Sequence, residues 1–398
     1  MIHAAFQRNG CHMNTEQIFS DLETELAAFI AHRTPAYLQD VISGGCYVYG
    51  AGSYGRRVLA LLKERGIPCH GIIDRRFGPE GEEIDGTPAL NPAALPGGSA
   101  AGKCLLIGVH NQAVAPAEII AFGRACAFRD ILWNADLPDA LGPGADNYWL
   151  TARKFTMEHF TEIRTASRFL ADEASVAVLA ALVRYRITGD PADYPPADIT
   201  QQYMPDELLN FPEPICFIDG GAYTGDTYSY LLSRNVVVKN WVAFEPDPEN
   251  FAKLTAFAAT LSAASTLFPC GLSETFMQVQ FAADEGAASH LGTGSGEMTV
   301  PCIALDDAIH GLCPDYIKLD IEGAEHSALL GMRKTIAAAR PHLAVSAYHR
   351  PEDLWVLAQT ITELAPYAEL HLRQHAFNAF DTVFYAVPQD GTKHSRVS

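Results

Sequence analysis

The fold is decided by one stretch, FIDGGAYTGD at residues 217–226. Its apolar start is typical of a buried strand that runs into Asp219. The glycines Gly220, Gly221 and Gly225 then allow the backbone to turn tightly and to approach a ligand closely. A helix is predicted directly afterwards, so its first N–H groups face the crevice at the carboxyl end of the strand. The stretch therefore predicts a ligand site on an open α/β sheet.

The next predicted strand, WVAFE at residues 241–245, ends in an acid. A carboxylate at this point can accept hydrogen bonds from both hydroxyls of a ribose, as in sites for NAD and for S-adenosylmethionine. Separately, Asp219 could cap the turn and Glu245 could precede a helix N-cap. Together, one strand–helix unit apart, they favour a nucleoside ligand. The residues predicted to contact it are Asp219, Gly220, Gly221, Ala222, Tyr223, Gly225, Asp226, Glu245 and Pro246.

A second candidate functional stretch is YIKLDIEGAE at residues 316–325, which is rich in ionisable residues. The period of a strand puts Lys318, Asp320 and Glu322 on one face, where ionisable groups are costly to bury without partners. They are expected to line the crevice or to pair with one another. The alternative is a Lys318–Asp320 pair, with Glu322 and Glu325 as acids at the start of the next helix.

His349 follows a strand predicted at 343–348, a position suited to a base or to a substrate contact. A single histidine is as often structural. The catalytic candidates are thus Lys318, Asp320, Glu322 and His349. A metal ion could use Asp320 and Glu322, but no third ligand is evident in the sequence, so no metal site is expected.

Strands and helices alternate in two regions, which predicts an α/β protein with two Rossmann-like domains. The predicted divisions are an N-terminal helical segment at 1–36, a Rossmann-like nucleotide- or sugar-nucleotide-binding domain at 37–143, a mainly helical connector at 144–212 and a larger domain at 213–390. In the larger domain, strands are expected at 215–219, 241–245, 265–270, 299–303, 316–321, 342–348, 367–373 and 382–387, and helices at 225–234, 248–261, 324–339 and 351–365. The last two strands lack a helix between them and should pair antiparallel. On the first of these two, His371, Arg373 and His375 are expected to form a solvated face.

The N-terminal domain carries its own glycine-rich turn, GAGSYG at residues 50–55. It has the GxGxxG spacing that receives a pyrophosphate, which the turn at 217–226 lacks, and an acid ends the next predicted strand. Alone, this pattern predicts NAD(P). The continuation IDRR at 73–76 and EIDGTPAL at 83–90 is similar to the N-terminal domain of bacterial sugar acetyltransferases, which implies a nucleotide-sugar. A third interpretation is a degenerate domain used for docking or dimerisation. The candidate contacts are Gly50, Gly52, Ser53, Tyr54, Gly55 and Asp74.

Composition limits the classes of partner. The 398 residues carry a formal net charge of −19, which is unsuited to binding nucleic acid or an anionic membrane and compatible with the sulfonium cation of S-adenosylmethionine. Nine cysteines without a CxxC pair indicate buried reduced thiols. The sequence shows neither a signal-peptide pattern nor an apolar run of membrane-spanning length, so a soluble cytoplasmic protein is expected.

From Phe217 to Val387 the sequence resembles the FkbM family of methyltransferases. The resemblance rests on the order and spacing of FIDGGAYTGDT, AFEPDPENFAKL, GLSE, CIALDD, YIKLDIEGAE, YHRPEDLW and DTVFYAVP, and Gln202-Tyr203 looks like the lead-in of two-domain bacterial members. It implies a class I methyltransferase fold, a doubly wound sheet, and methyl transfer from S-adenosylmethionine, often to a sugar or polyketide hydroxyl. It further implies cofactor contacts at Asp219, Gly221, Gly225 and Glu245, and an acceptor near Asp320, Glu322 and His349. The family pattern does not fix which residue is the base.

We therefore expect a two-domain, cytoplasmic enzyme of polysaccharide biosynthesis that uses S-adenosylmethionine to O-methylate a sugar or glycan precursor. The expected partners are this small-molecule or glycan acceptor and, as a further candidate, a second copy of the chain. One alternative is an NAD(P)-dependent oxidoreductase that uses the N-terminal domain. The other is a non-catalytic, cofactor-binding scaffold in polysaccharide assembly.

Overall fold

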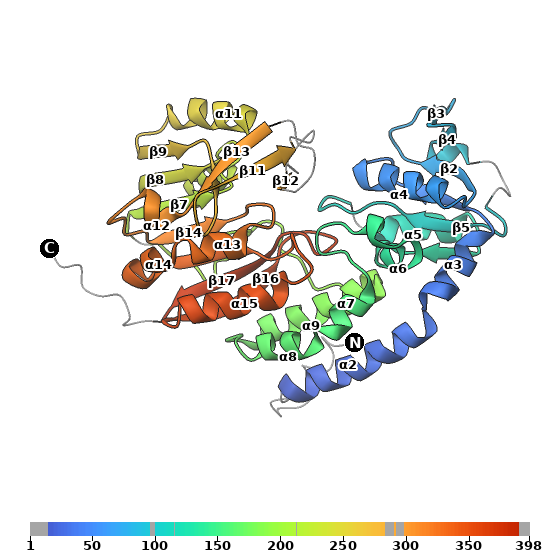
Figure 1. The fold of residues 1–398 in the computed structure, drawn as a ribbon, viewed down its shortest axis with the longest axis horizontal. Helices are drawn as coiled ribbons and strands as arrows, with labels where there is room; N and C mark the ends of the chain where they lie inside the picture. Colours follow the sequence, from blue (N-terminus) through green and yellow to red (C-terminus); the bar gives the residue numbers. More distant parts are fainter. Residues whose placement is uncertain are drawn as a thin grey trace.

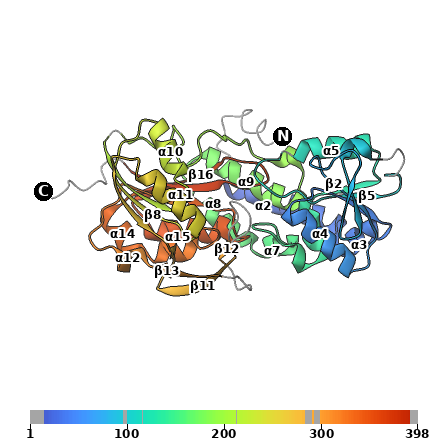
Figure 2. The same cartoon turned by 90° about the horizontal axis from the view of Figure 1, so that it is seen from above.

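The computed structural model describes residues 15–95, 100–114, 116–211, 213–282, 290–291 and 298–389. Within these residues the strands form a six-stranded, a four-stranded and a seven-stranded sheet. Figure 1 shows two lobes: the six-stranded sheet lies in one lobe, in blue to teal, and the other two sheets lie in the second, in yellow to red. Helices from the N-terminus and from the middle of the chain run along the edge between the lobes, as the turned view in Figure 2 also shows.

The seven-stranded sheet has the order β16-β17-β15-β14-β7-β8-β9. Its strands are β7 Ile215–Gly220, β8 Val238–Phe244, β9 Ala264–Phe268, β14 Tyr316–Leu319, β15 His342–Ser346, β16 Ala368–Gln374 and β17 Thr382–Pro388. The first strand, β7, lies between β8 and β14 and is parallel to both. β17 is antiparallel to β15 and β16, so the expected terminal antiparallel pair is confirmed. This is the doubly wound α/β sheet that the sequence predicted, and its order reverses beside β7, where such sheets bind ligands.

The helices of this lobe are α10 Asp226–Ser233, α11 Pro248–Ala258, α12 Leu305–Ala308, α13 Glu325–Leu330, α14 Arg333–Ala339 and α15 Asp353–Leu364. The single helix expected at 324–339 is wrong, because α13 and α14 are separated at Gly331. A Cβ on Gly331 would lie 2.0 Å from the carbonyl oxygen of Ser273. The close approach of this neighbouring backbone coincides with the break.

The four-stranded sheet has the order β10-β13-β11-β12. Its strands are β10 Gly271–Leu272, β11 Met277–Ala282, β12 His290–Leu291 and β13 Met298–Ile303. The strand predicted at 299–303 is present as β13. The prediction that it belongs to the main alternation of strands and helices is wrong. β13 pairs antiparallel with β11, a strand that the sequence reading missed, and therefore lies outside the main sheet.

The N-terminal lobe contains the six-stranded sheet with the order β3-β4-β2-β1-β5-β6. Its elements are β1 Cys46–Tyr49, β2 Cys69–Ile73, β3 Glu82–Ile84, β4 Thr87–Leu90, β5 Cys104–Ile107, β6 Asp130–Leu132, α3 Pro35–Ser43, α4 Ser53–Glu64, α5 Pro116–Ala125 and α6 Leu137–Leu141. The antiparallel hairpin of β3 and β4 was not predicted. Its signal was Asp85-Gly86, whose positive φ values of 48° and 75° fit a tight hairpin turn.

Four helices join the lobes: α2 Thr15–His32, α7 Arg153–Glu158, α8 Phe160–Ser167 and α9 Glu173–Thr188. The connector is helical as expected up to Thr188, and among the described residues beyond it, up to β7, only a 3-10 turn at Pro191–Asp193 follows. α9 packs on α2 and on β16. None of the helices in the described ranges is long and apolar enough to cross a membrane. The cysteines of those ranges are all free thiols, whereas Cys11 lies outside them.

The prediction of a solvated face on β16 is wrong, because α9 packs on this strand. His371 and His375 are buried. Asp172, the N-cap of α9, lies 2.6 Å from Nδ1 of His371 and accepts a 2.9 Å hydrogen bond from Arg373. Burial alone would raise the pKa of Asp172, but His371, Arg373 and Ser175 hold it well below its ordinary value. Contacts of His371 and Arg373 on β16 with Asp172 therefore hold the connector against the larger lobe.

The loop between β16 and β17 joins the two lobes directly. Asn378 Nδ2 donates to the carbonyl oxygens of Asn111 (2.7 Å) and Val114 (3.0 Å) in the N-terminal lobe. The indole of Trp149 donates to the backbone oxygen of Asn378 at 2.8 Å, and the hydroxyl of Tyr185 donates to its side-chain oxygen at 2.9 Å. Because Asn378 is 1% exposed, these bonds are sheltered from water.

We predict that Gly55→Ala lowers the free energy of unfolding by more than about 2 kcal/mol, because its new Cβ would overpack the helix–strand contact. That Cβ would lie 1.9 Å from the carbonyl oxygen of Gly50. Gly52→Ala is the matched control: Gly52 has φ −72° and no atom within 4 Å of an added Cβ. The control should change stability by less than about 1 kcal/mol in urea denaturation. Equal effects of the two changes would contradict the packing account.

Candidate active site

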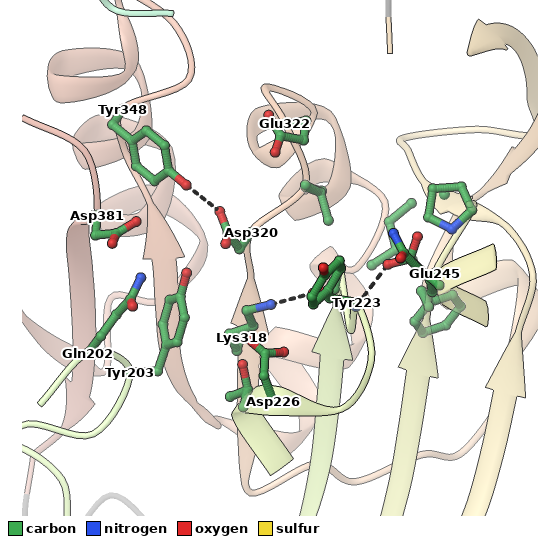
Figure 3. A pocket seen from close by; sticks show the side chains of 18 of the residues that line it. Gln202, Tyr203, Tyr223, Asp226, Glu245, Lys318, Asp320, Glu322, Tyr348 and Asp381 are labelled. Atoms are coloured by element: carbon green, nitrogen blue, oxygen red, sulfur yellow. Dashed lines mark hydrogen bonds between the residues drawn. The ribbon is translucent and has the colours of Figure 1, made fainter. Parts of the chain in front are cut away.

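A cavity of about 450 Å³ opens at the carboxyl ends of β7, β8 and β14 (Figure 3). Open α/β sheets bind ligands at this edge, and the volume is in the range of small-molecule sites. The turn after β7 contributes Gly221, Tyr223 and Asp226 to its wall, and the ends of β8 and β14 contribute Glu245 and Asp320. The cavity therefore brings together all three polar stretches that the sequence singled out around β7, β8 and β14.

Two glycines in the turn after β7 are required by packing. Gly221 has φ +70°, and a Cβ there would lie 1.8 Å from the carbonyl oxygen of Asp320. Gly225 has φ +91°, and a Cβ there would lie 2.4 Å from an aromatic ring. The turn after β7 therefore touches the turn after β14. Of the predicted cofactor residues in this turn, Gly221, Tyr223 and Asp226 line the cavity, whereas Gly220, Ala222 and Gly225 do not.

Glu245 is held rigidly at the end of β8. Its Oε2 accepts a 2.8 Å hydrogen bond from the N–H of Tyr223, and its Oε1 accepts one of 2.8 Å from the N–H of Asp247. The side chain is buried and, with Pro246, lines the cavity. Burial raises the pKa of Glu245 to about 7, despite these two hydrogen bonds. Each carboxylate oxygen has lone pairs left for hydroxyl donors.

Asp219 does not line the cavity; it lies beneath Lys318. Lys318 Nζ is 3.3 Å from Asp219 Oδ1 and donates to the carbonyl oxygens of Gly220 (3.1 Å) and Gly221 (2.6 Å). The alternative pairing of Lys318 with Asp320 is thus wrong, because the parallel register sets Lys318 opposite Asp219. Burial raises the pKa of Asp219 to about 6 even beside Lys318. Burial would lower the pKa of Lys318, but the surrounding carboxylates raise it.

The remaining catalytic candidates gather around His349, whose side chain is 1% exposed. Its Nδ1 lies 2.8 Å from Oε1 of Glu325, and its Nε2 lies 3.4 Å from Oδ1 of Asp320 and 3.7 Å from Oε2 of Glu322. The hydroxyl of Tyr348 donates to Asp320 at 3.2 Å (Figure 3). The sequence expected Glu325 only as an acid at a helix start, yet it is buried against His349.

The acids dominate the electrostatics of this group. Burial alone would lower the pKa of His349, but Glu325, Glu322 and Asp320 raise it to about 10. Burial alone would raise the pKa of Asp320, but His349 and Lys318 hold it below its ordinary value. The raised pKa of His349 reflects the negative potential of the three carboxylates, and the lowered pKa of Asp320 reflects the positive charges beside it.

Several cavity residues were given no role by the sequence. Gln202, Tyr203 and Asp381 lie in stretches that carried the family resemblance, so that signal could have identified them. Gln112 and Tyr148 come from outside the larger lobe. Tyr148 packs edge-on against Phe380, with 5.0 Å between ring centroids, and its ring lies 6.0 Å from that of His349. Only the docking of the lobes brings these side chains to the cavity.

In the second candidate nucleotide site, several polar side chains already bond to other groups of the chain. Asp74 Oδ2 accepts a 2.8 Å hydrogen bond from the N–H of Ala51 and pairs with Arg76 at 3.0 Å. Tyr54 is buried, and its hydroxyl donates to the carbonyl oxygen of Ala145 at 3.0 Å. Gly52 and Ser53 are exposed at the start of α4. A ligand at Gly50, Gly52, Ser53, Tyr54, Gly55 and Asp74 stays a prediction.

Asp219→Asn should destabilise the chain by about 3 kcal/mol, because it leaves the Lys318 charge buried without its partner. Urea denaturation measures the change. Asp226→Asn, an exposed acid in the first turn of α10, is the control and should cost less than about 1 kcal/mol. A stable Asp219→Asn protein with weakened binding of S-adenosylhomocysteine would instead make Asp219 a ligand contact.

Comparisons with known proteins identify a family domain within the chain and a similar fold. The sequence model of the "Methyltransferase FkbM domain" matches residues 219–378. No curated protein matches the chain. A putative rRNA-methylase from Clostridium thermocellum covers 46% of this chain and 89% of its own, with 10% identity and a TM-score of 0.30. A TehB-like SAM-dependent methyltransferase from Corynebacterium glutamicum ATCC 13032 Kitasato covers 45% and 83%, with 12% identity and a TM-score of 0.25. These two similarities are too low to add to the assignment.

A methyltransferase FkbM from Methylobacillus flagellatus KT is similar in structure over 93% of this chain and 100% of its own, with 23% identity and a TM-score of 0.76. At this identity the similarity concerns the fold, which the two chains share through both lobes. The recognised family therefore agrees with the doubly wound sheet and with the cavity at its edge. Residues 219–378 of this chain form a methyltransferase domain of the FkbM family.

Proposed function

We propose that this chain is an S-adenosylmethionine-dependent O-methyltransferase that acts on a hydroxyl of a sugar or glycan precursor. The observation that carries the proposal is the rigid carboxylate of Glu245, which faces a small-molecule cavity beside the glycine turn of an FkbM methyltransferase domain. A carboxylate in this position suits the two hydroxyls of a ribose.

The cavity residues fit S-adenosylmethionine. Glu245 would accept the ribose hydroxyls, and Gly221 and Tyr223 would lie along the nucleoside. Leu272 and Ile321 offer apolar surface in the same cavity. When bound, the cofactor supplies a methyl group already activated by its sulfonium charge. The acids that line the cavity, together with the net charge of −19, favour a cationic ligand.

On the acceptor side, Asp320 and Tyr348 line the same cavity. Because methyl transfer to oxygen requires an aligned hydroxyl that loses its proton, a carboxylate there would orient the hydroxyl and accept the proton. Glu322 and His349 would extend this polar wall. Lys318 is not in this role: it holds Asp219 and the turn after β7, so it is a positioning residue.

A second cavity of about 400 Å³ supports an acceptor path between the lobes. It is lined by Arg57 and Asp146 from the N-terminal part and by His349 from the larger lobe. Tyr148 and Glu322 line both cavities, so the two are adjacent. Charged and hydroxyl-bearing linings of this kind suit a hydroxylated acceptor, and the N-terminal lobe would then help to select it.

Glu245→Gln should weaken binding of S-adenosylhomocysteine by about 10- to 100-fold, because it replaces charge-assisted hydrogen bonds to the ribose with neutral ones. Isothermal titration calorimetry of the full chain measures the affinity, with NAD⁺ and a UDP-sugar as parallel ligands. The matched control is Glu249→Gln, an exposed acid four residues later, which should leave the affinity unchanged. NAD⁺ binding without S-adenosylhomocysteine binding would favour the oxidoreductase instead.

Asp320→Asn should keep the affinity for S-adenosylhomocysteine but slow methyl transfer by about 100-fold or more, because the acceptor hydroxyl loses its orienting carboxylate. Transfer of a labelled methyl group to a panel of nucleotide sugars measures the rate. An unchanged rate would move the acceptor contact away from Asp320. Cofactor binding by the wild-type chain without transfer to any member of the panel would count for the non-catalytic scaffold.

A further inference from the structure

Asp320, Glu325 and His349 form a compact cluster at the base of the acceptor side. Each places one atom able to bind a metal within 4.8 Å of such atoms on the other two. His349 and Glu325 have side chains that are 1% exposed, and Asp320 is 27% exposed. An ion with bonds of about 2.1–2.4 Å holds its ligand atoms roughly 3–4.5 Å apart, so the cluster has the size of a single-ion site.

Three atoms of the cluster have unmet hydrogen-bonding capacity. Among the described residues, both ring nitrogens of His349 and Oε2 of Glu325 are buried and make no hydrogen bond. Leaving such atoms unsatisfied is costly. Nδ1 of His349 lies 2.8 Å from Glu325 Oε1. Both ring nitrogens thus face carboxylates without a hydrogen bond, and an ion bound among these groups would give the buried atoms a partner.

The nearby cations neutralise this cluster only in part, although Lys318 and His349 hold the pKa of Asp320 below its ordinary value. Lys318 is taken by Asp219 and by two backbone oxygens. The buried guanidinium of Arg186 donates to the carbonyl oxygens of Ala347 (3.3 Å) and Pro351 (3.1 Å). Glu322, which reaches within 3.7 Å of His349, adds a further carboxylate. Several buried acids around one imidazole leave an excess of negative charge that a divalent cation would balance.

The cluster is also reachable. Asp320 lines the larger cavity, His349 lines the smaller one, and Glu322 lines both. An ion bound here would therefore face the space proposed for the acceptor. The side chains, two carboxylates and one imidazole, suit a hard or borderline divalent ion such as Mn²⁺ or Mg²⁺.

We propose that Asp320, Glu325 and His349 bind a divalent cation, with Glu322 at the rim of the site. The sequence predicted no metal site because it offered no third ligand; the fold supplies Glu325 and His349. Binding of the ion is independent of the proposed function. Its role rests on that function: the ion would hold an acceptor hydroxyl, and coordination makes a hydroxyl more acidic.

The test is a titration of the chelator-treated full chain with MnCl₂, followed by the electron paramagnetic resonance signal of unbound Mn²⁺. We expect about one bound ion per chain, which also raises the melting temperature. Asp320→Asn and Glu325→Gln should each weaken Mn²⁺ binding by at least about tenfold. Glu352→Gln changes an acid beside the same segment that is outside the cluster and should have less than about a threefold effect.

Absence of saturable binding to the wild-type chain would overturn the proposal, as would equal binding by all variants. The melting-temperature shift of the wild-type chain needs no substitution, so it decides the matter if Asp320→Asn or Glu325→Gln fails to fold. Calorimetry with S-adenosylhomocysteine in the absence of metal is a separate readout. Cofactor binding without Mn²⁺ binding defeats this inference alone, and the reverse result defeats the proposed function alone.

Discussion

The buried ion pair between Lys318 and Asp219 is the constraint on which the site depends. It joins two neighbouring parallel strands, β7 and β14, at the point where both end. Because two charges are withdrawn from water, the pair is stable only while both partners and their hydrogen bonds are in place. Lys318 meets this condition by also donating to the backbone of Gly220 and Gly221. The same ammonium group thereby fixes the shape of the turn that forms part of the cavity wall.

From this pair the two sides of the cavity follow. On one side, the turn after β7 presents the N–H of Tyr223 to Glu245 and so sets the carboxylate of β8. On the other side, the contact of Gly221 with the backbone of Asp320 sets the turn after β14. The side of the cavity with Glu245 is built from short segments close to one strand–helix unit. The side with His349 and its acids needs β14, β15 and α13 together, and it brings three carboxylates to one imidazole.

The docking of the lobes closes the site. Asn378 satisfies its side chain and backbone with partners from the N-terminal lobe and the connector. This fixes Phe380 against Tyr148 and brings the N-terminal part of the chain to the cavity wall. The structure from Methylobacillus flagellatus KT shares both lobes. The rest of the chain thus contributes cavity residues, Gln112 and Tyr148, that the methyltransferase domain alone lacks.

The sequence by itself determined the sheet, the turn at its centre and the acid after β8. These signals are local: an apolar strand, glycines with positive φ, and a carboxylate one unit later occur within about thirty residues, so short-range geometry suffices to read them. Only the tertiary structure decided which side chains of the site pair with one another. Lys318 pairs with Asp219 and not with the nearby Asp320, because strand register outweighs sequence distance. Glu325 is a buried partner of His349, and Tyr148 lines the cavity. Neither contact could be predicted from the sequence, because packing brings together segments that are far apart in the chain and that no periodic pattern relates.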